Sequence, residues 1–329
     1  MHRSWTLLAF LLAAAVPGQA AAASEDCAYD PARTHLSRIV AADSTNGPIF
    51  GQMVSAADKP QTRTLSLLDH EIVLTFDDGP NPATTPVILD TLDRHCVKAT
   101  FFSIGSMALL HSKTLREVAA RGHTIGSHTW SHPLSIRSMP PGRIKAEIEG
   151  GFAAVSLAAG EPVAPFFRFP GLGDSPEAIA YLASRNVSTW SVDVVAGDAE
   201  RGATPARIAH NTITRLEALG KGIVLFHDTK RATADALDGI LTNLENQGYK
   251  VVHIVSNTAY RPNDEVLANP EILRVMADAA KAGKRTEPKA ALEDGPVTVI
   301  HNEWVELDPR GPVPVREARA RLAVTDRVK

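Results

Sequence analysis

The sequence predicts an α/β fold, a distorted (β/α)7 barrel of parallel strands with N- and C-terminal extensions. Between residues 70 and 256, short runs of aliphatic and aromatic residues alternate with longer segments of helical periodicity. The short runs are apolar throughout, as expected of parallel strands covered on both faces. So many strand–helix units favour a closed or distorted barrel over an open sheet. In such barrels the active groups lie at the carboxyl ends of the strands.

Each short apolar run predicts a strand, and each longer segment predicts a helix. Strands are expected at residues 72–76, 99–104, 124–127, 165–169, 187–192, 222–226 and 250–255. Helices are expected at residues 85–95, 108–121, 141–159, 176–185, 205–219 and 233–247. Thr204 and Pro205 are typical of a helix start, and Gly160 is typical of a helix end.

The remaining regions predict extensions. Residues 24–69 have no sustained period, so we expect an N-terminal extension that lies on the main domain, which spans residues 70–256. Residues 257–329 are rich in Ala and charged residues and predict a partly ordered C-terminal extension of unassigned role. Within it, residues 270–284 are the best candidate for a helix and residues 297–305 for a strand.

Residues 1–23 have the pattern of a signal peptide. Arg3 precedes an apolar stretch over residues 5–16, and small residues follow it. The stretch is short for a bilayer span, although an uncleaved anchor is the alternative interpretation. We therefore expect export to the periplasm or beyond the cell, with no stable membrane insertion after cleavage.

The charge balance of the chain bears on whether it binds nucleic acid. The chain is 44% hydrophobic and 22% charged, with a net charge of −3. This near-balance argues against nucleic-acid binding, which requires a basic surface.

The two cysteines, Cys27 and Cys96, would pair in an oxidising compartment. The alternative is that Cys96 is a small buried apolar residue.

Two segments predict a metal site. Asp77 and Asp78 end the first strand and precede Gly-Pro, so their mutual repulsion requires a nearby cation unless they only form a turn. His128 and His132 follow another strand, four residues apart, which on a helical turn would direct both rings to one metal. Asp78 with these histidines would hold a divalent cation and leave coordination positions open.

Three further segments place polar groups at strand ends. Arg168 ends an apolar strand and needs a buried partner, for which Asp77 is suited. The strand through residue 192 gives way to a segment that begins and ends with Asp193 and Asp198. His227 ends the most apolar strand, where a satisfied core histidine, followed by Asp228 as a helix cap, is the alternative. Together these positions predict one active site at the carboxyl ends of the strands.

The segments TFDDGP, SHTWSHP, RFPG and LFHD, in this order, resemble the motifs of the NodB-homology polysaccharide deacetylases, carbohydrate esterase family four. The resemblance covers roughly residues 70–256. It implies that Asp78, His128 and His132 bind a divalent cation, zinc first and cobalt or nickel as alternatives. It also implies that Asp77 is the general base and that Arg168 pairs with Asp77 and orients it.

The same resemblance assigns roles in the later motifs. It implies that His227 is the general acid and that Leu225 lines the pocket for the acetyl methyl group. Asp198 matches the aspartate of the fourth motif and is expected to set the charge state around Arg168 and His227. The family pattern places a tryptophan after this aspartate to wall the substrate groove, whereas this chain has Ala199.

The expected function is the hydrolytic N-deacetylation of an N-acetylglucosamine-containing glycan, such as peptidoglycan, a chitin-like oligomer or an exopolysaccharide. Pro170 is a further expected substrate contact. Trp130 is expected either to stack on a sugar ring or to pack beneath the histidines. The alternatives are a xylan-type O-acetyl esterase on the same scaffold and a non-catalytic glycan-binding envelope protein. The sequence assigns no oligomeric state.

Overall fold

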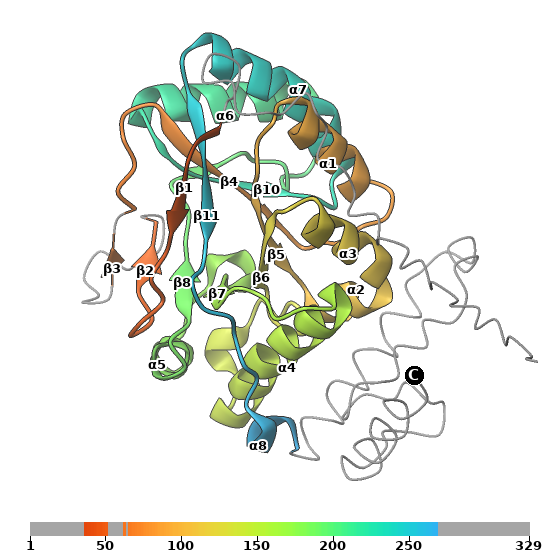
Figure 1. Ribbon diagram of the computed structural model, residues 1–329, viewed down its shortest axis with the longest axis vertical. Helices are drawn as coiled ribbons and strands as arrows, with labels where there is room; N and C mark the ends of the chain where they lie inside the picture. The colour runs from red at the N-terminus through yellow and green to blue at the C-terminus, as the bar shows by residue number, and fades with distance from the viewer. Residues whose placement is uncertain (1–35, 52–61, 64, 269–329) are drawn as a thin grey trace, which may run out of the picture.

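The computed structural model of the protein describes residues 36–51, 62–63 and 65–268. The strands of these residues form one sheet, and every strand pairing in it is parallel (Figure 1). This confirms the predicted parallel α/β class. The predicted signal peptide, Cys27, and the candidate helix and strand after residue 269 lie outside the described residues, so these predictions stay open.

The strands are short and differ little from the predicted ranges. They are β1 (Leu36–Ala41), β2 (Ile49–Phe50), β3 (Thr62–Arg63), β4 (Glu71–Asp77), β5 (Thr100–Ser103), β6 (Thr124–Ser127), β7 (Phe166–Phe167), β8 (Ser188–Trp190), β9 (Val194–Val195), β10 (Gly222–His227) and β11 (Lys250–Val255). Strands β1 and β2 belong to the predicted N-terminal extension, and they pair with β11 and β8. The sequence analysis missed them, and also β9, because runs this short or mixed show no periodicity.

The sheet curves around β4. One side of β4 pairs with β5, after which β6, β7 and β8 follow, and the other side pairs with β10, which carries β9. Strand β11 pairs only with the first two residues of β4, Glu71 and Ile72, and then diverges from it. Among the described residues no pairing joins β8 to β9, and the two strands are connected only by the short segment between Trp190 and Val194.

Helices surround the curved sheet (Figure 1). They are α1 (Thr85–Arg94), α2 (Gly105–Leu110), α3 (Ser112–Ala120), α4 (Pro141–Ala159), α5 (Pro176–Ser184), α6 (Pro205–Leu219), α7 (Arg231–Asn246) and α8 (Asp264–Leu267). The predicted ends are confirmed, because the Thr204 side chain accepts a hydrogen bond from Arg207 N and Gly160 is left-handed. The single helix predicted over 108–121 is instead two, since His111 leaves the helical conformation at φ −119° and ψ 42°.

Strand alternation separates two cores. Ile72, Leu74 and Phe76 face outward and pack with the helices, whereas Val73 faces inward. The inward core is built entirely from strands and connections, including Phe102, Phe166, Trp190, Ile223 and Leu225. Because side chains alternate along a strand, the residues that follow on the inward face of each strand lie above this core.

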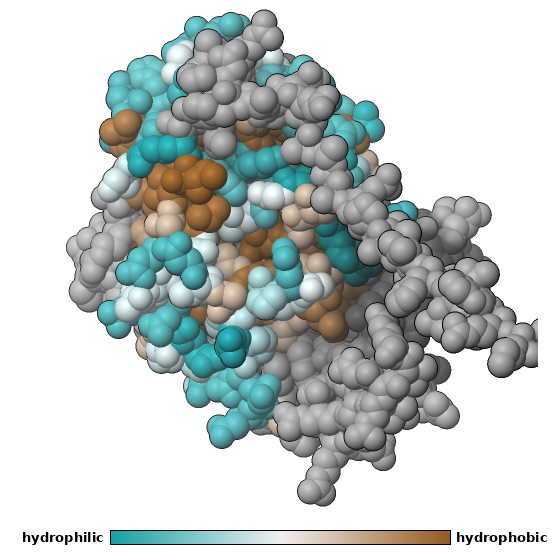
Figure 2. Space-filling model, in the orientation of Figure 1, coloured by the Kyte–Doolittle hydropathy of each residue, from teal (hydrophilic) through white to brown (hydrophobic). Residues whose placement is uncertain are grey.

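The surface is mixed in character. Figure 2 shows hydrophilic residues over much of one face and an apolar patch at its upper left, over the edge strand β1. Ile39, in that strand, is 61% exposed. None of the helices in the described part of the chain is long and apolar enough to cross a membrane.

Helix α4 lies unusually close to the segment that follows β6. A Cβ on Gly151 would lie 2.6 Å from the backbone carbon of Thr129. We therefore expect Gly151→Ala to lower the free energy of unfolding by about 1–3 kcal/mol through overpacking. In the matched control, Gly239→Ala on the exposed face of α7, the new Cβ meets nothing within 4 Å. That variant should gain up to about 1 kcal/mol from helix propensity. Urea denaturation of both variants tests the difference, and equal effects would contradict this packing.

Candidate active site

The candidate catalytic residues end the inward faces of their strands. Val73 and Thr75 precede Asp77 along β4, Phe166 precedes Arg168 after β7, and Leu225 precedes His227 along β10. The register of the sheet pairs His227 with Asp77. Because all these strands are parallel, their polar ends meet at one end of the barrel, as the sequence predicted.

Asp78, His128 and His132 converge at this end. The Asp78 Oδ1 atom lies 3.1 Å from His132 Nε2 and 3.5 Å from His128 Nε2. The candidate ligand atoms all lie within 4.8 Å of one another. Asp78 Oδ1 is buried without a well-formed hydrogen bond, so it fits the role of a ligand. Burial raises the pKa of Asp78, but the two histidines outweigh burial and hold it well below its usual range.

The backbone around the histidines corrects one expectation. The sequence placed His128 and His132 on a helical turn, whereas the segment is a loop with left-handed Thr129 (φ 68°) and His132 (φ 58°). The loop closes on itself, since His132 N donates to Thr129 Oγ1 at 3.0 Å. The two rings still meet, with centroids 5.0 Å apart. The four-residue spacing was informative, but the conformation assumed for it was wrong.

Arg168 connects Asp77, the candidate base, to the candidate ligand His128. Its Nη1 donates to Asp77 Oδ1 at 2.8 Å and to Thr75 Oγ1 at 2.7 Å, so the predicted Arg168–Asp77 pair is present. The carbonyl oxygen of Arg168 lies 2.8 Å from His128 Nδ1, which must therefore carry the proton and leave Nε2 free to bind a cation. The other oxygen of Asp77, Oδ2, lies 3.8 Å from that Nε2.

The Arg168 guanidinium is fully buried, and each of its three nitrogens donates at least one hydrogen bond. Its Nε donates to Trp190 O and its Nη2 to Ser191 O, each at 3.1 Å. The ring of Phe102 lies 4.3 Å below its central carbon. Burial lowers the pKa of Arg168, and the charge of Asp77 opposes this effect. Removing either partner would leave a buried, unpaired charge.

His227 pairs with Asp198. The distance from Nδ1 to Asp198 Oδ1 is 2.8 Å, and Asp198 Oδ2 accepts from His227 N and from Thr233 Oγ1, each at 2.7 Å. Burial lowers the pKa of His227, but Asp198 and the charges of Asp77 and Asp78 raise it to about 9. Asp198 was also expected to act on Arg168, but among the described residues no hydrogen bond or ion pair joins the two side chains. The second carboxylate that stabilises the charge of Arg168 is Asp193.

The three expected substrate contacts, Leu225, Pro170 and Trp130, are all buried. Leu225 is 6% exposed and lies at the inward core beneath the site. Pro170 is buried at the start of a short turn, Pro170–Leu172. Trp130 is 1% exposed and packs in the outer core, so it cannot stack on a sugar; the alternative, packing beneath the loop, is the one that fits. Ala199 is exposed beside Asp198.

Asp228 is a residue whose role the sequence analysis missed. It does not cap α7, whose N-cap is Lys230. Its Oδ2 accepts from Thr85 Oγ1 at 2.6 Å, and its backbone N donates to Asp77 O. A Cβ on Gly79 would lie 2.0 Å from Asp228 Oδ2, so only glycine fits there. Burial, with the charges of Asp78 and Asp77, raises the pKa of Asp228 to about 7.

The fold and the site define an α/β protein with two histidines and one aspartate gathered at the carboxyl ends of parallel strands. The sequence model of the polysaccharide deacetylase family matches residues 66–190 of this chain. A peptidoglycan-N-acetylglucosamine deacetylase of Bacillus cereus is 31% identical over 195 residues, which are 58% of this chain and 89% of the relative. The chain therefore belongs to the polysaccharide deacetylase family.

Two further relatives extend the comparison. The peptidoglycan-N-acetylglucosamine deacetylase PgdA of Listeria monocytogenes is 31% identical over 237 residues, which are 69% of this chain. The matched part is 46% of PgdA, so this chain spans about half the length of that relative. The solved structure of the peptidoglycan deacetylase Bd3279 of Bdellovibrio bacteriovorus superposes with a TM-score of 0.59 and is 30% identical. That superposition covers 67% of this chain and 59% of Bd3279.

The raised pKa of His227 depends on Asp198. In metal-free protein, NMR titration should find His227 protonated until the pH approaches about 9. Replacing Asp198 by Asn keeps the shape but removes the charge, so the pKa of His227 should fall from about 9 towards 6.5. Asp238→Asn is a suitable control, because Asp238 contacts His95 and Arg94 instead. An unchanged pKa in the Asp198 variant would contradict the pairing.

Proposed function

We propose that the protein removes the N-acetyl group from N-acetylglucosamine units of a glycan, with peptidoglycan as the first substrate to test. The observation that carries the proposal is that a candidate base and a candidate acid each lie close to one of the candidate metal ligands. Asp77 Oδ2 lies 3.8 Å from His128 Nε2, and His227 Nε2 lies 4.0 Å from Asp78 Oδ2. This arrangement is suited to hydrolysis of an amide.

A divalent cation bound by Asp78, His128 and His132 would act as a Lewis acid and lower the pKa of water at the site. Asp77 receives a proton from the attacking water as oxygen bonds to the acetyl carbon. Arg168 holds Asp77 Oδ1 at 2.8 Å, so Oδ2 is the oxygen directed towards the ligand set. Zinc is the proposed cation, with cobalt or nickel as substitutes.

His227 completes the reaction. Asp198 holds its Nδ1, which leaves the Nε2 proton for the leaving amine as the carbon–nitrogen bond breaks. With a pKa near 9, the ring is protonated at neutral pH, before any cation binds. The products are acetate and a free amino sugar, so water is the only co-reactant.

The choice of substrate rests on the relatives named above, two of which carry peptidoglycan-N-acetylglucosamine in their names. Ala199 replaces the tryptophan expected to wall the groove, and it is exposed. A groove without that wall suits a sugar within a polymer strand. We propose that the protein acts outside the cytoplasm, on the basis of the signal-like residues 1–23.

Chelation and reloading test metal dependence. We expect acetate release from N-acetylglucosamine oligomers or peptidoglycan to cease with chelator and to return with zinc or cobalt. Asp77→Asn should lower kcat by about 10²–10⁴-fold, as for loss of a general base, while metal is still bound. Asp69→Asn serves as a control, since Asp69 is 79% exposed and pairs with His70. Full activity of the Asp77 variant would refute the assigned base.

Substrate comparison separates the proposal from the O-acetyl esterase alternative. Acetate release should be faster from N-acetylglucosamine oligomers and peptidoglycan than from acetylated xylan, measured by kcat/KM on each. The reverse order would favour the esterase. Absence of acetate from all substrates, with metal bound, would favour a glycan-binding protein instead.

A further inference from the structure

We propose that Glu147 is a positioning residue of the loop between the two histidine ligands, and that it fixes His132 by holding Ser131. The inference rests on the proposed metal site. It concerns a residue in the middle of α4, distant in sequence from every motif, which gave no functional signal because the helix around it is mainly apolar.

The two histidines are supported in different ways. His128 is 2% exposed, and its ring is oriented by the carbonyl of Arg168. The side chain of His132 is 27% exposed, and within the described part of the chain its ring pairs with Asp78 and lies against the ring of His128, itself a candidate ligand, with no hydrogen bond from the protein scaffold to orient it. The place of His132 therefore depends on its backbone. That backbone is in the left-handed region, as is the β-branched Thr129, and such conformations persist only when surrounding contacts hold them.

Glu147 supplies these contacts. Its Oε2 accepts from Ser131 N at 2.9 Å, its Oε1 accepts from Ser131 Oγ at 2.7 Å, and its main-chain oxygen accepts from Trp130 N at 2.9 Å. Glu147 is 1% exposed, so water does not compete for its oxygens. One residue thus binds the two loop residues that immediately precede His132. The close approach of α4 at Gly151 keeps the helix against the same loop.

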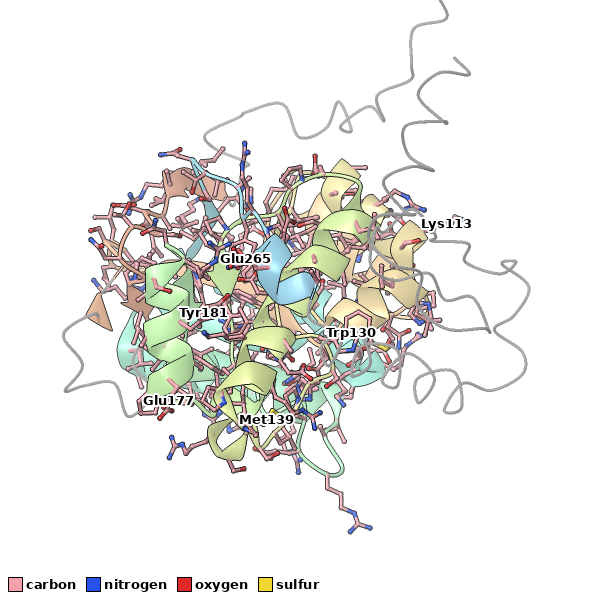
Figure 3. The ribbon with its side chains drawn as sticks, turned by 90° about the horizontal axis from the view of Figure 1, so that it is seen from below. Lys113, Trp130, Met139, Glu177, Tyr181 and Glu265 are labelled. Carbon is pink, nitrogen blue, oxygen red and sulfur yellow. The ribbon has the colours of Figure 1, made fainter. Side chains whose placement is uncertain are left out.

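The helix contains a matched control. Glu149 is also fully buried, and it accepts from Tyr181 Oη, Tyr260 Oη, Arg185 Nε and Asn263 N at 2.6–3.1 Å. These partners belong to α5, to its C-cap Arg185 and to the segment before α8. Figure 3 shows Trp130 and Tyr181 on opposite sides of α4. Loss of Glu149 removes a comparable buried carboxylate without touching the histidine loop.

The test is metal affinity. Glu147→Ala and Glu149→Ala proteins are titrated with zinc by calorimetry, and the absorption spectrum of the cobalt-loaded form is recorded. We expect Glu147→Ala to weaken zinc binding by about 10–100-fold, as is usual when support of a ligand is lost, and to change the cobalt spectrum. Glu149→Ala should lose thermal stability but bind zinc within threefold of the parent protein. Glu147→Gln should bind almost as the parent does, because its amide can accept from Ser131 N and donate to Ser131 Oγ.

The outcomes are separable. Zinc binding within threefold of the parent in Glu147→Ala, or an equal loss in Glu149→Ala, overturns the positioning role. If Glu147→Ala does not fold, Ser131→Ala decides, since it removes one of the two side-chain bonds. That variant should weaken zinc binding severalfold, and unchanged affinity overturns the proposal. A parent protein that binds no zinc or cobalt contradicts the proposed metal site itself, which is a different failure.

Discussion

The buried guanidinium of Arg168 is the interaction on which the rest of the site depends. A charge inside a barrel of apolar side chains is costly unless it is paired and hydrogen-bonded. Here the donors go to Asp77, to Thr75 and to two carbonyls at the end of β8. The main-chain oxygen of the same residue orients His128. The candidate base Asp77, the candidate ligand His128 and the barrel wall are therefore fixed by one residue, and none of them can shift without exposing a buried charge.

This arrangement explains why the inward core ends where it does. Large side chains such as Phe102 and Trp190 fill the barrel below Arg168, and the Phe102 ring faces the guanidinium. Beyond Arg168, towards the carboxyl ends of the strands, the inward side chains are polar: Asp77 on β4 and His227 on β10. The acidic groups gathered there, including Asp78 and Asp198, outnumber the fixed positive charges, which makes a bound cation electrostatically favourable.

The sequence predicted this level of the structure well. Because a polar residue ends each of these apolar runs, and the carboxyl ends of the strands meet in a barrel, the sequence places Asp77, Arg168 and His227 together, as the structure does. It did not predict what depends on tertiary contacts. The loop at Thr129 takes a left-handed conformation that no local signal announces, and the burial of Trp130 follows from α4 packing over it. That Asp193, and not Asp198, is the second carboxylate acting on Arg168 was also beyond reach, because these two residues are only five positions apart in one irregular segment.

Helix α4 holds two segments that are distant in the sequence, the loop after β6 and the segment after β11. Glu149 fastens Tyr260 and Asn263 to the helix, and Tyr260 stacks on Phe152 at 3.9 Å between ring centroids. Two residues earlier, Glu147 fastens the histidine loop. Local opening of α4 would release both attachments together, so the ligand loop and the segment after β11 belong to one cooperative unit. Protection of their amides from hydrogen exchange is thus tied to a single opening event, and anything that stabilises one end of the unit slows exchange at the other.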